Sequence, residues 1–92
     1  MLFRSDPNTI PVPFAPDIVV EVLSPSESVI DVNRKVKEYL AGGCQEVWLL
    51  DHMNGKAFIY AAAKGFRVLD GDDILDTPLL PGFSTRLRDL FQ

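Results

Sequence analysis

The sequence predicts an α/β fold in which a β-α-β unit is followed by antiparallel strands and a closing helical turn. Three observations lead to this prediction: a short apolar segment between prolines, an amphipathic helical stretch after it, and an Asn-Gly turn between two later apolar segments. A chain of 92 residues has room for one hydrophobic core, so these elements belong to a single domain.

The first sixteen residues are expected to form an extended arm. They contain four of the seven prolines, and proline removes a backbone donor and restricts the residue before it, which excludes a central strand. We therefore divide the chain into a proline-rich arm over residues 1–16 and a folded unit over residues 17–92.

Residues 17–23 (Asp-Ile-Val-Val-Glu-Val-Leu) are predicted to form the first strand. The segment is short, rich in β-branched residues and apolar on both faces, and it is bounded by Pro16 and Ser24-Pro25. This pattern is typical of a strand that is covered on both faces, as in a parallel sheet.

A helix is predicted over residues 28–41 and a second strand over residues 46–50. Ser28 and Asp31 resemble a capping box at the helix start, and Gly42-Gly43 supply the stop. A strand-helix-strand unit with short loops is right-handed, so the two strands are expected to be parallel. The apolar residues that share one face of the helix are Val29, Val32, Val36, Tyr39 and Leu40.

The rest of the chain is predicted to be antiparallel and then irregular. Asn54-Gly55 is a strong hairpin signal, which places residues 56–61 antiparallel to the strand before them. Residues 66–69 read as an edge strand and residues 70–73 as a turn. The apolar stretch 77–83 is expected to be irregular but packed, and residues 84–91 to form a helical turn.

Composition and charge limit the classes of protein to which this chain can belong. The hydrophobic share of 47% and charged share of 24% are those of a globular chain and exclude disorder. A net charge of −4 argues against a protein that coats nucleic acid, but it allows a nuclease with an acidic metal site. One cysteine (Cys44) and one histidine (His52) exclude an internal disulfide and a Cys/His zinc site. No signal peptide or bilayer-length apolar run occurs, so a cytoplasmic protein is expected.

Glu21 is the unusual residue, because it lies in the middle of the apolar segment 17–23. Burying a carboxylate costs several kcal/mol unless it is paired, protonated or bound to a metal. Two interpretations are open: a structural ion pair, or a metal-binding acid at a catalytic site. Asp17 shares the strand face but lies about 13 Å along the strand, too far to share one ion. We expect Asp17 to accept backbone hydrogen bonds at the strand entrance.

Lys35 is the expected partner of Glu21. On a helical wheel it lies beside Val32 and Tyr39 at the border of the apolar stripe, whereas Arg34 points away from that stripe. A border lysine can bury its methylene stem and bring its ammonium group onto the sheet. The crossover places this helix across the sheet that contains Glu21, so contact between the two side chains is predicted if Glu21 points to the helix side. The sequence does not fix which face of the strand Glu21 uses.

The segment from Pro16 to Ser26 resembles the Uma-two family of restriction endonucleases, a branch of the PD-(D/E)XK nuclease superfamily. The resemblance continues through Asp31, residues 35–39, residues 41–43 and residues 46–51, and it ends with residues 79–83 and 90–91. It implies a restriction-endonuclease-like mixed sheet flanked by helices and Mg²⁺-dependent hydrolysis of DNA phosphodiester bonds. The metal-binding acid of the family's E-x-K motif maps to Glu21. The usual lysine position is Leu23, and a helix lysine that substitutes for it maps to Lys35.

The sequence departs from the family at its N-terminal end. Members carry an earlier strand whose Pro-Asp supplies a second metal-binding carboxylate, and here that strand is missing, so the chain reads as a truncated half-domain. Asp6 is a poor substitute. With one carboxylate, Mg²⁺ is expected to bind weakly. An open sheet edge beside the Glu21 strand predicts a homodimer.

Two alternatives to a nuclease remain open: a non-catalytic dimerising remnant, and an interaction module in which the Glu21–Lys35 pair is structural.

Overall fold

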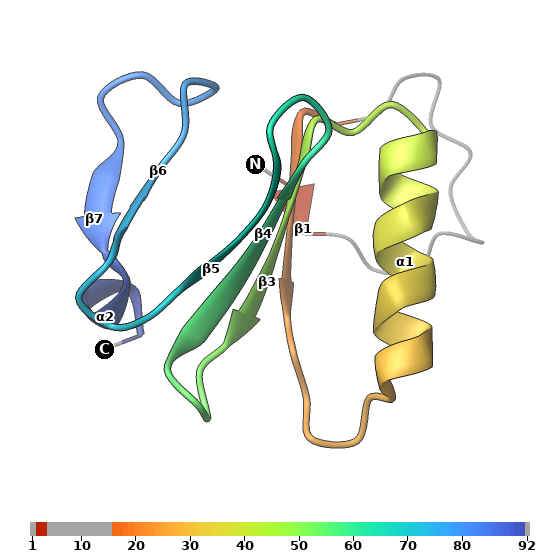
Figure 1. Ribbon diagram of the computed structural model, residues 1–92, viewed down its shortest axis with the longest axis horizontal. Coiled ribbons are helices and arrows are strands. Elements are labelled where there is room, and N and C mark those ends of the chain that lie inside the picture. Colours follow the sequence, from red (N-terminus) through yellow and green to blue (C-terminus); the bar gives the residue numbers. More distant parts are fainter. Residues whose placement is uncertain (1, 4–15, 92) are drawn as a thin grey trace.

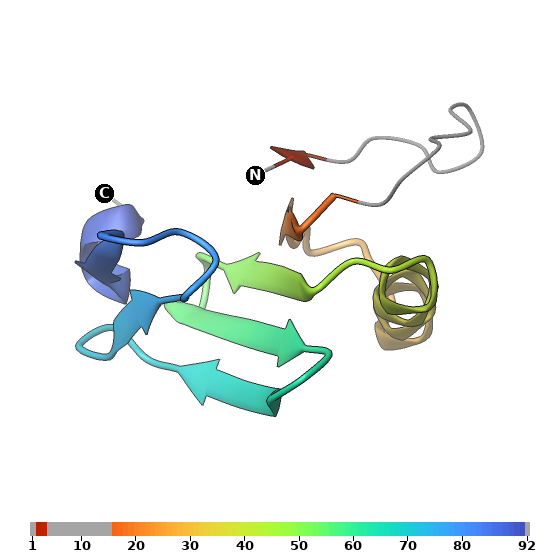
Figure 2. The same cartoon turned by 90° about the horizontal axis from the view of Figure 1, so that it is seen from above.

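The computed structural model describes residues 2–3 and 16–91. It contains a five-stranded mixed sheet in the order β1-β2-β3-β4-β5 and a separate two-stranded ribbon, β6-β7. Helix α1 covers one face of the sheet, and the ribbon and helix α2 cover the opposite face (Figures 1 and 2). The elements are β1 (Leu2–Phe3), β2 (Ile18–Val22), α1 (Val29–Ala41), β3 (Glu46–Asp51), β4 (Lys56–Ala61), β5 (Gly65–Leu69), β6 (Ile74–Asp76), β7 (Ser84–Arg86) and α2 (Leu87–Leu90).

The predicted β-α-β unit and hairpin are confirmed. Strands β2 and β3 are parallel, with Glu21 opposite Leu49, and α1 forms the crossover between them. Strands β3 and β4 are antiparallel. Gly55 has a φ of 67° in the turn that joins them, a conformation that glycine adopts without steric cost.

Helix α1 begins directly after Ser28 and ends directly before Gly42, the residues that were predicted to start and stop it. The Ser28 hydroxyl accepts a hydrogen bond from the Asp31 backbone N–H at 3.1 Å. Gly43, just past the helix, has a φ of 104°. The expected packing of Val29 is wrong, because its side chain is 76% exposed. Packing of α1 on the sheet begins one turn later, at Val32.

Side chains alternate between two cores, because successive residues of a strand point to opposite faces. The core under α1 contains Val19, Val36, Cys44, Val47 and Leu49. The opposite core contains Ile18, Val20, Trp48, Leu50, Ala57, Ile59, Leu69, Leu75 and Leu87. The β2 and β3 segments are therefore apolar on both faces, as the sequence pattern indicated.

The C-terminal segment is more regular than expected. Strand β6 pairs with β7 in antiparallel register, with Leu75 opposite Thr85, and the helical turn starts at Leu87 and not at Ser84. Leu75 and Leu87 are fully buried against the sheet. β6 and β7 have three residues each, and an alternating pattern over three residues is too short to predict a strand from the sequence. Their pairing appears only in the folded structure.

The edge of the sheet beside β2 is partly covered, contrary to the expectation of an open edge. β1 pairs in parallel with β2 at Val19 and Val20. At the other end of the sheet, β5 pairs only with β4 among the described strands. Residues 1 and 4–15 of the predicted arm, including Asp6, lie outside the described residues. In the portion that the structure describes, no helix has the length and apolar character needed to cross a membrane.

Candidate active site

Glu21 lies near the end of β2, on the sheet face that α1 covers. Its neighbours Val20 and Val22 point to the opposite face, since strand residues alternate. Glu21 is half-buried, so the expectation of a fully buried acid is wrong. The carboxylate sits where the covered part of the strand ends, at the side of a small hollow between β2 and α1.

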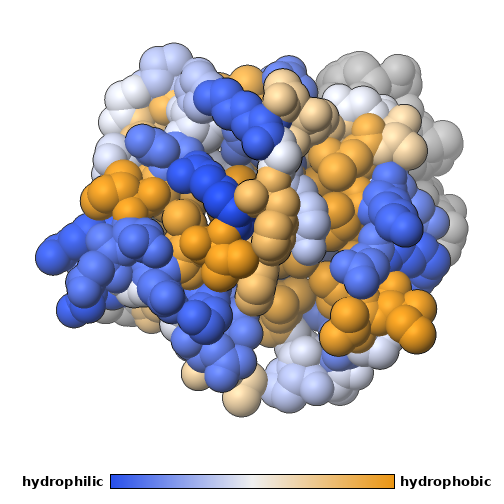
Figure 3. Space-filling view, in the orientation of Figure 1, coloured by the Kyte–Doolittle hydropathy of each residue, from blue (hydrophilic) through white to orange (hydrophobic). Residues whose placement is uncertain are grey.

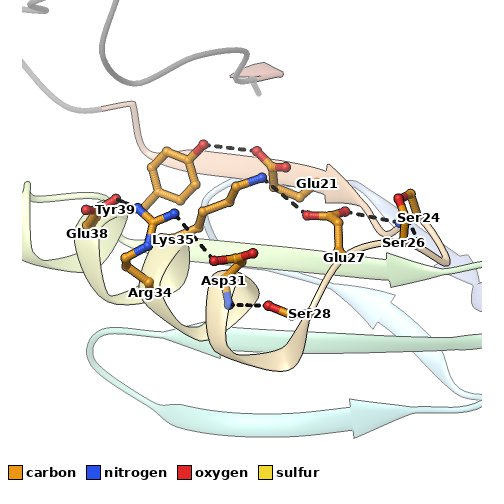
Figure 4. Close-up of polar contacts among 10 residues, drawn as sticks. All are labelled: Glu21, Ser24, Ser26, Glu27, Ser28, Asp31, Arg34, Lys35, Glu38 and Tyr39. Atoms are coloured by element: carbon orange, nitrogen blue, oxygen red, sulfur yellow. Dashed lines mark hydrogen bonds and ion pairs between the residues drawn. The ribbon is translucent and has the colours of Figure 1, made fainter.

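Tyr39 of α1 hydrogen-bonds to this carboxylate. Its hydroxyl donates to Oε2 of Glu21 at 3.0 Å (Figure 4). Within the described part of the chain, Oε1 of Glu21 has no protein partner. One carboxylate oxygen is therefore held and the other is available.

Lys35 and Glu21 line the same hollow, as the wheel predicted, but the expected direct ion pair between them is not formed. The Lys35 ammonium group instead donates to Oε2 of Glu27 at 3.2 Å (Figure 4). These two side chains are 32% and 23% exposed, respectively. The hollow also includes Tyr39, and its apolar lining is formed by Leu23, Val32, Val36, Val47 and Leu49.

Glu27 is the site residue that sequence reasoning missed. It belongs to a tight loop in which the Ser24 backbone N–H donates to Oε1 of Glu27 and the Glu27 backbone N–H donates to the Ser24 carbonyl, each at 3.1 Å. One carboxylate oxygen thus closes the loop and the other holds Lys35. The Ser-x-x-Glu spacing of residues 24–27 is the signal that could have identified this reciprocal pattern.

Among the described residues, the buried acid is Glu46, which is 7% exposed. Its carboxylate accepts hydrogen bonds from the Trp48 indole at 2.8 Å and from the Thr77 hydroxyl at 2.6 Å. The Trp48 indole thus bonds to a carboxylate two residues away on the same strand. Both carboxylate oxygens are satisfied, so Glu46 has a structural role that joins β3 to the segment after β6.

Asp17 does not belong to the hollow. Its exposed carboxylate accepts a hydrogen bond from the Gln45 side chain at 3.1 Å. The backbone bonds expected for its side chain are made by its carbonyl oxygen, which accepts the N–H groups of Gln45 and Glu46. Asp17 therefore anchors the start of β2 to the start of β3.

The other titratable candidates also lie away from the hollow. Cys44 is buried and its thiol donates to the Glu46 carbonyl at 3.0 Å. Burial raises the pKa of the Cys44 thiol, which disfavours the reactive thiolate. His52 is exposed, and its ring forms an edge-to-face pair with the ring of Phe91.

The donor set of the hollow fits a divalent cation that is only partly held by protein. Across residues 2–3 and 16–91, no group of three His, Cys, Asp or Glu side chains is placed so that it could hold a metal ion. Glu21 nevertheless offers one carboxylate oxygen without a protein partner, and Glu21, Glu27 and Lys35 together carry one net negative charge. Mg²⁺ sites of this type use one or two carboxylates and complete the shell with water and substrate phosphate oxygens.

The mixed sheet, with an acid on a strand and a lysine on the crossover helix, has the arrangement that the resemblance to restriction-endonuclease-like nucleases implied. Residues 3–88 match the model of the Uma2 family, described as "putative restriction endonuclease". The chain belongs to this family. None of the curated proteins matches the sequence.

A solved structure shares the fold. It is a putative nuclease belonging to DUF820 from Anabaena variabilis ATCC 29413, 30% identical to this chain with a TM-score of 0.75. The similarity covers 85% of this chain and 45% of that one. The chain thus spans less than half the length of the protein that it resembles.

Proposed function

We propose that this chain is a Mg²⁺-dependent endonuclease that hydrolyses phosphodiester bonds of DNA, with Glu21 and Lys35 as its catalytic residues. The observation that carries the proposal is the hollow between β2 and α1, where an acid and a lysine from consecutive elements lie together in a member of a nuclease family. A cytoplasmic location is part of the same proposal.

Glu21 is proposed to bind the metal. Its Oε1 has no protein partner in the described part of the chain, whereas Oε2 is held by Tyr39. When bound, the ion stabilises the negative charge that develops on the phosphate and lowers the pKa of a coordinated water.

Lys35 is proposed to polarise the attacking water or the scissile phosphate. Its ammonium group has three N–H donors, and among the described residues one contact, to Glu27, is formed. The remaining donors are available to phosphate oxygens. The Lys35 side chain is 32% exposed, beside the apolar residues that line the hollow, and its partial removal from water strengthens its interaction with a bound anion.

A non-catalytic remnant is the second candidate function. It is favoured by the shortage of carboxylates, because Glu21 and Glu27 are the acids of the hollow and Glu27 is already engaged with Lys35. In this alternative the chain folds and associates but hydrolyses nothing.

We also propose a homodimer that forms through an exposed sheet edge. β5 is the candidate edge, since it has a strand on one side only and its Phe66 and Val68 side chains are 54% and 46% exposed. Figure 3, which looks onto this side of the sheet, shows hydrophobic surface along the sheet beside α1.

The test of the nuclease is plasmid nicking by the purified chain in Mg²⁺ or Mn²⁺. Glu21→Gln keeps an acceptor for the Tyr39 hydroxyl but removes the charge that binds the metal, so its nicking rate should fall by about 100-fold or more. Lys35→Met should reduce the rate comparably, because it keeps the apolar stem and removes the ammonium group.

Asp17→Asn is the matched control, since it changes an acid on the same face of the same strand that lies outside the hollow. This variant should nick plasmid DNA at the same rate as the unchanged chain. Equal rates for the unchanged chain and Glu21→Gln would contradict the proposed site, and no nicking by any form would favour the non-catalytic remnant.

A further inference from the structure

We infer that Tyr39 is a positioning residue: its hydroxyl fixes the Glu21 carboxylate so that Oε1 faces the metal position. This inference rests on the proposed function, because it assigns Tyr39 a role through the acid proposed to bind the ion. The observations that carry it are the bond from the Tyr39 hydroxyl to Oε2 and the free state of Oε1 within the described residues.

The Tyr39 hydroxyl has a well-defined position because its ring is packed. The ring contacts the core under α1, which includes Val36 and Val47. Tyr39 also lies one helical turn after Lys35, on the same side of α1. One helix therefore presents the ammonium group and the phenol to the same hollow, as Figure 4 shows.

Glu21 needs such a partner because its own strand does not fix its carboxylate. A glutamate side chain has several rotatable bonds, and this one is half-buried at the end of the covered part of β2. A hydrogen bond donated to a carboxylate is charge-assisted and therefore strong enough to select one rotamer.

The test uses Tyr39→Phe, which removes the hydroxyl and keeps the packed ring. Direct Mn²⁺ binding, followed by the loss of the free-ion electron paramagnetic resonance signal, should weaken by roughly 10-fold, the usual effect of losing a hydrogen bond that orients a metal ligand. The Mn²⁺ concentration that gives half-maximal nicking should rise by the same factor, and the rate at saturating Mn²⁺ should change less.

Tyr60→Phe is the matched control, because Tyr60 is another half-buried tyrosine that packs on the same core but does not line the hollow. It should leave Mn²⁺ binding unchanged.

A further measurement needs neither metal nor DNA. In protein with ¹³C-labelled glutamate, the nuclear magnetic resonance signal of the Glu21 carboxyl carbon should shift in Tyr39→Phe and stay in place in Tyr60→Phe.

The outcomes separate this inference from the proposed function. If the unchanged chain binds Mn²⁺ and nicks DNA, and Tyr39→Phe does both with the same metal dependence, the positioning role is overturned and the nuclease stands. An unshifted Glu21 carboxyl signal in Tyr39→Phe also overturns it. If the unchanged chain neither binds Mn²⁺ nor nicks DNA, the proposed function fails, and the positioning role fails with it.

Discussion

Glu46 connects parts of the molecule that lie far apart in sequence. Its carboxylate accepts one hydrogen bond from the Trp48 indole, within β3, and one from the hydroxyl of Thr77, after β6. All three residues are buried, with exposed fractions of 7%, 2% and 6%, respectively. Buried polar groups of this kind stabilise a fold only while every partner is present.

Glu46→Ala should lower the free energy of unfolding by about 2–4 kcal/mol, because it leaves the Trp48 N–H and the Thr77 hydroxyl buried without an acceptor. Glu46→Gln keeps one hydrogen-bond acceptor, so it should lower the free energy of unfolding by a smaller amount. Urea unfolding followed by fluorescence measures the change directly, since Trp48 is the one tryptophan of the chain.

Glu38→Gln is a suitable control for Glu46, because Glu38 is exposed on α1 and exposed ion pairs contribute little. A Glu46→Ala variant as stable as this control would contradict the structural role of the buried carboxylate.

At the scale of elements, α1 brings the candidate site together. It is the crossover between β2 and β3, and it carries both Lys35 and Tyr39. Its start is fixed by the Ser28 hydroxyl, which accepts the Asp31 backbone N–H. Any fraying of this first turn also disturbs the adjoining loop that holds Glu27.

Ser28→Ala should lower the free energy of unfolding by about 1 kcal/mol, because a helix N–H loses its capping acceptor. The Lys35 ammonium would also lose part of its support from Glu27, so the nicking rate should fall modestly. Far-ultraviolet circular dichroism during urea unfolding measures the first effect. Ser84→Ala, at an exposed position of β7, should change neither quantity.

At the scale of the whole molecule, the two edges of the sheet differ. β1 covers the β2 edge at Val19 and Val20, whereas the outer side of β5 has no neighbouring strand in the described part of the chain. Phe66 of β5 stacks on Phe58, with ring centroids 6.4 Å apart, and its ring lies tilted against that of Tyr60, with centroids 4.8 Å apart. An uncovered strand with apolar side chains can pair with another chain.

If the β5 edge mediates the homodimer, light scattering should give twice the mass of one chain, and Val68→Lys should give a monomer. A lysine on an edge strand opposes pairing with a second copy because the charge would be buried. Val22→Lys, at the exposed end of β2, is the control and should remain dimeric. Loss of the dimer in Val22→Lys alone would place association at the edge beside Glu21.

The elements that the sequence predicted well depend on local chemistry. The two-faced apolar pattern identified β2 and β3, Ser28 and Gly42-Gly43 marked α1, and Asn54-Gly55 marked the hairpin. Each signal acts over a few residues, through backbone conformation or side-chain period. The helical wheel placed Lys35 at the border of the apolar stripe of α1, whereas the sheet face that Glu21 uses was left open by the sequence and is given by the structure.

The sequence by itself determined strands β2 to β5 and the crossover helix, because their signals are local. The sheet face that Glu21 uses was decided by the tertiary structure. Only the tertiary structure decided which acid is buried and which partner each charged group takes. Lys35 contacts Glu27 because the 24–27 loop closes beside α1, and Glu46 is satisfied by Thr77, 31 residues away. Such contacts depend on how distant segments pack together, which a local pattern does not record.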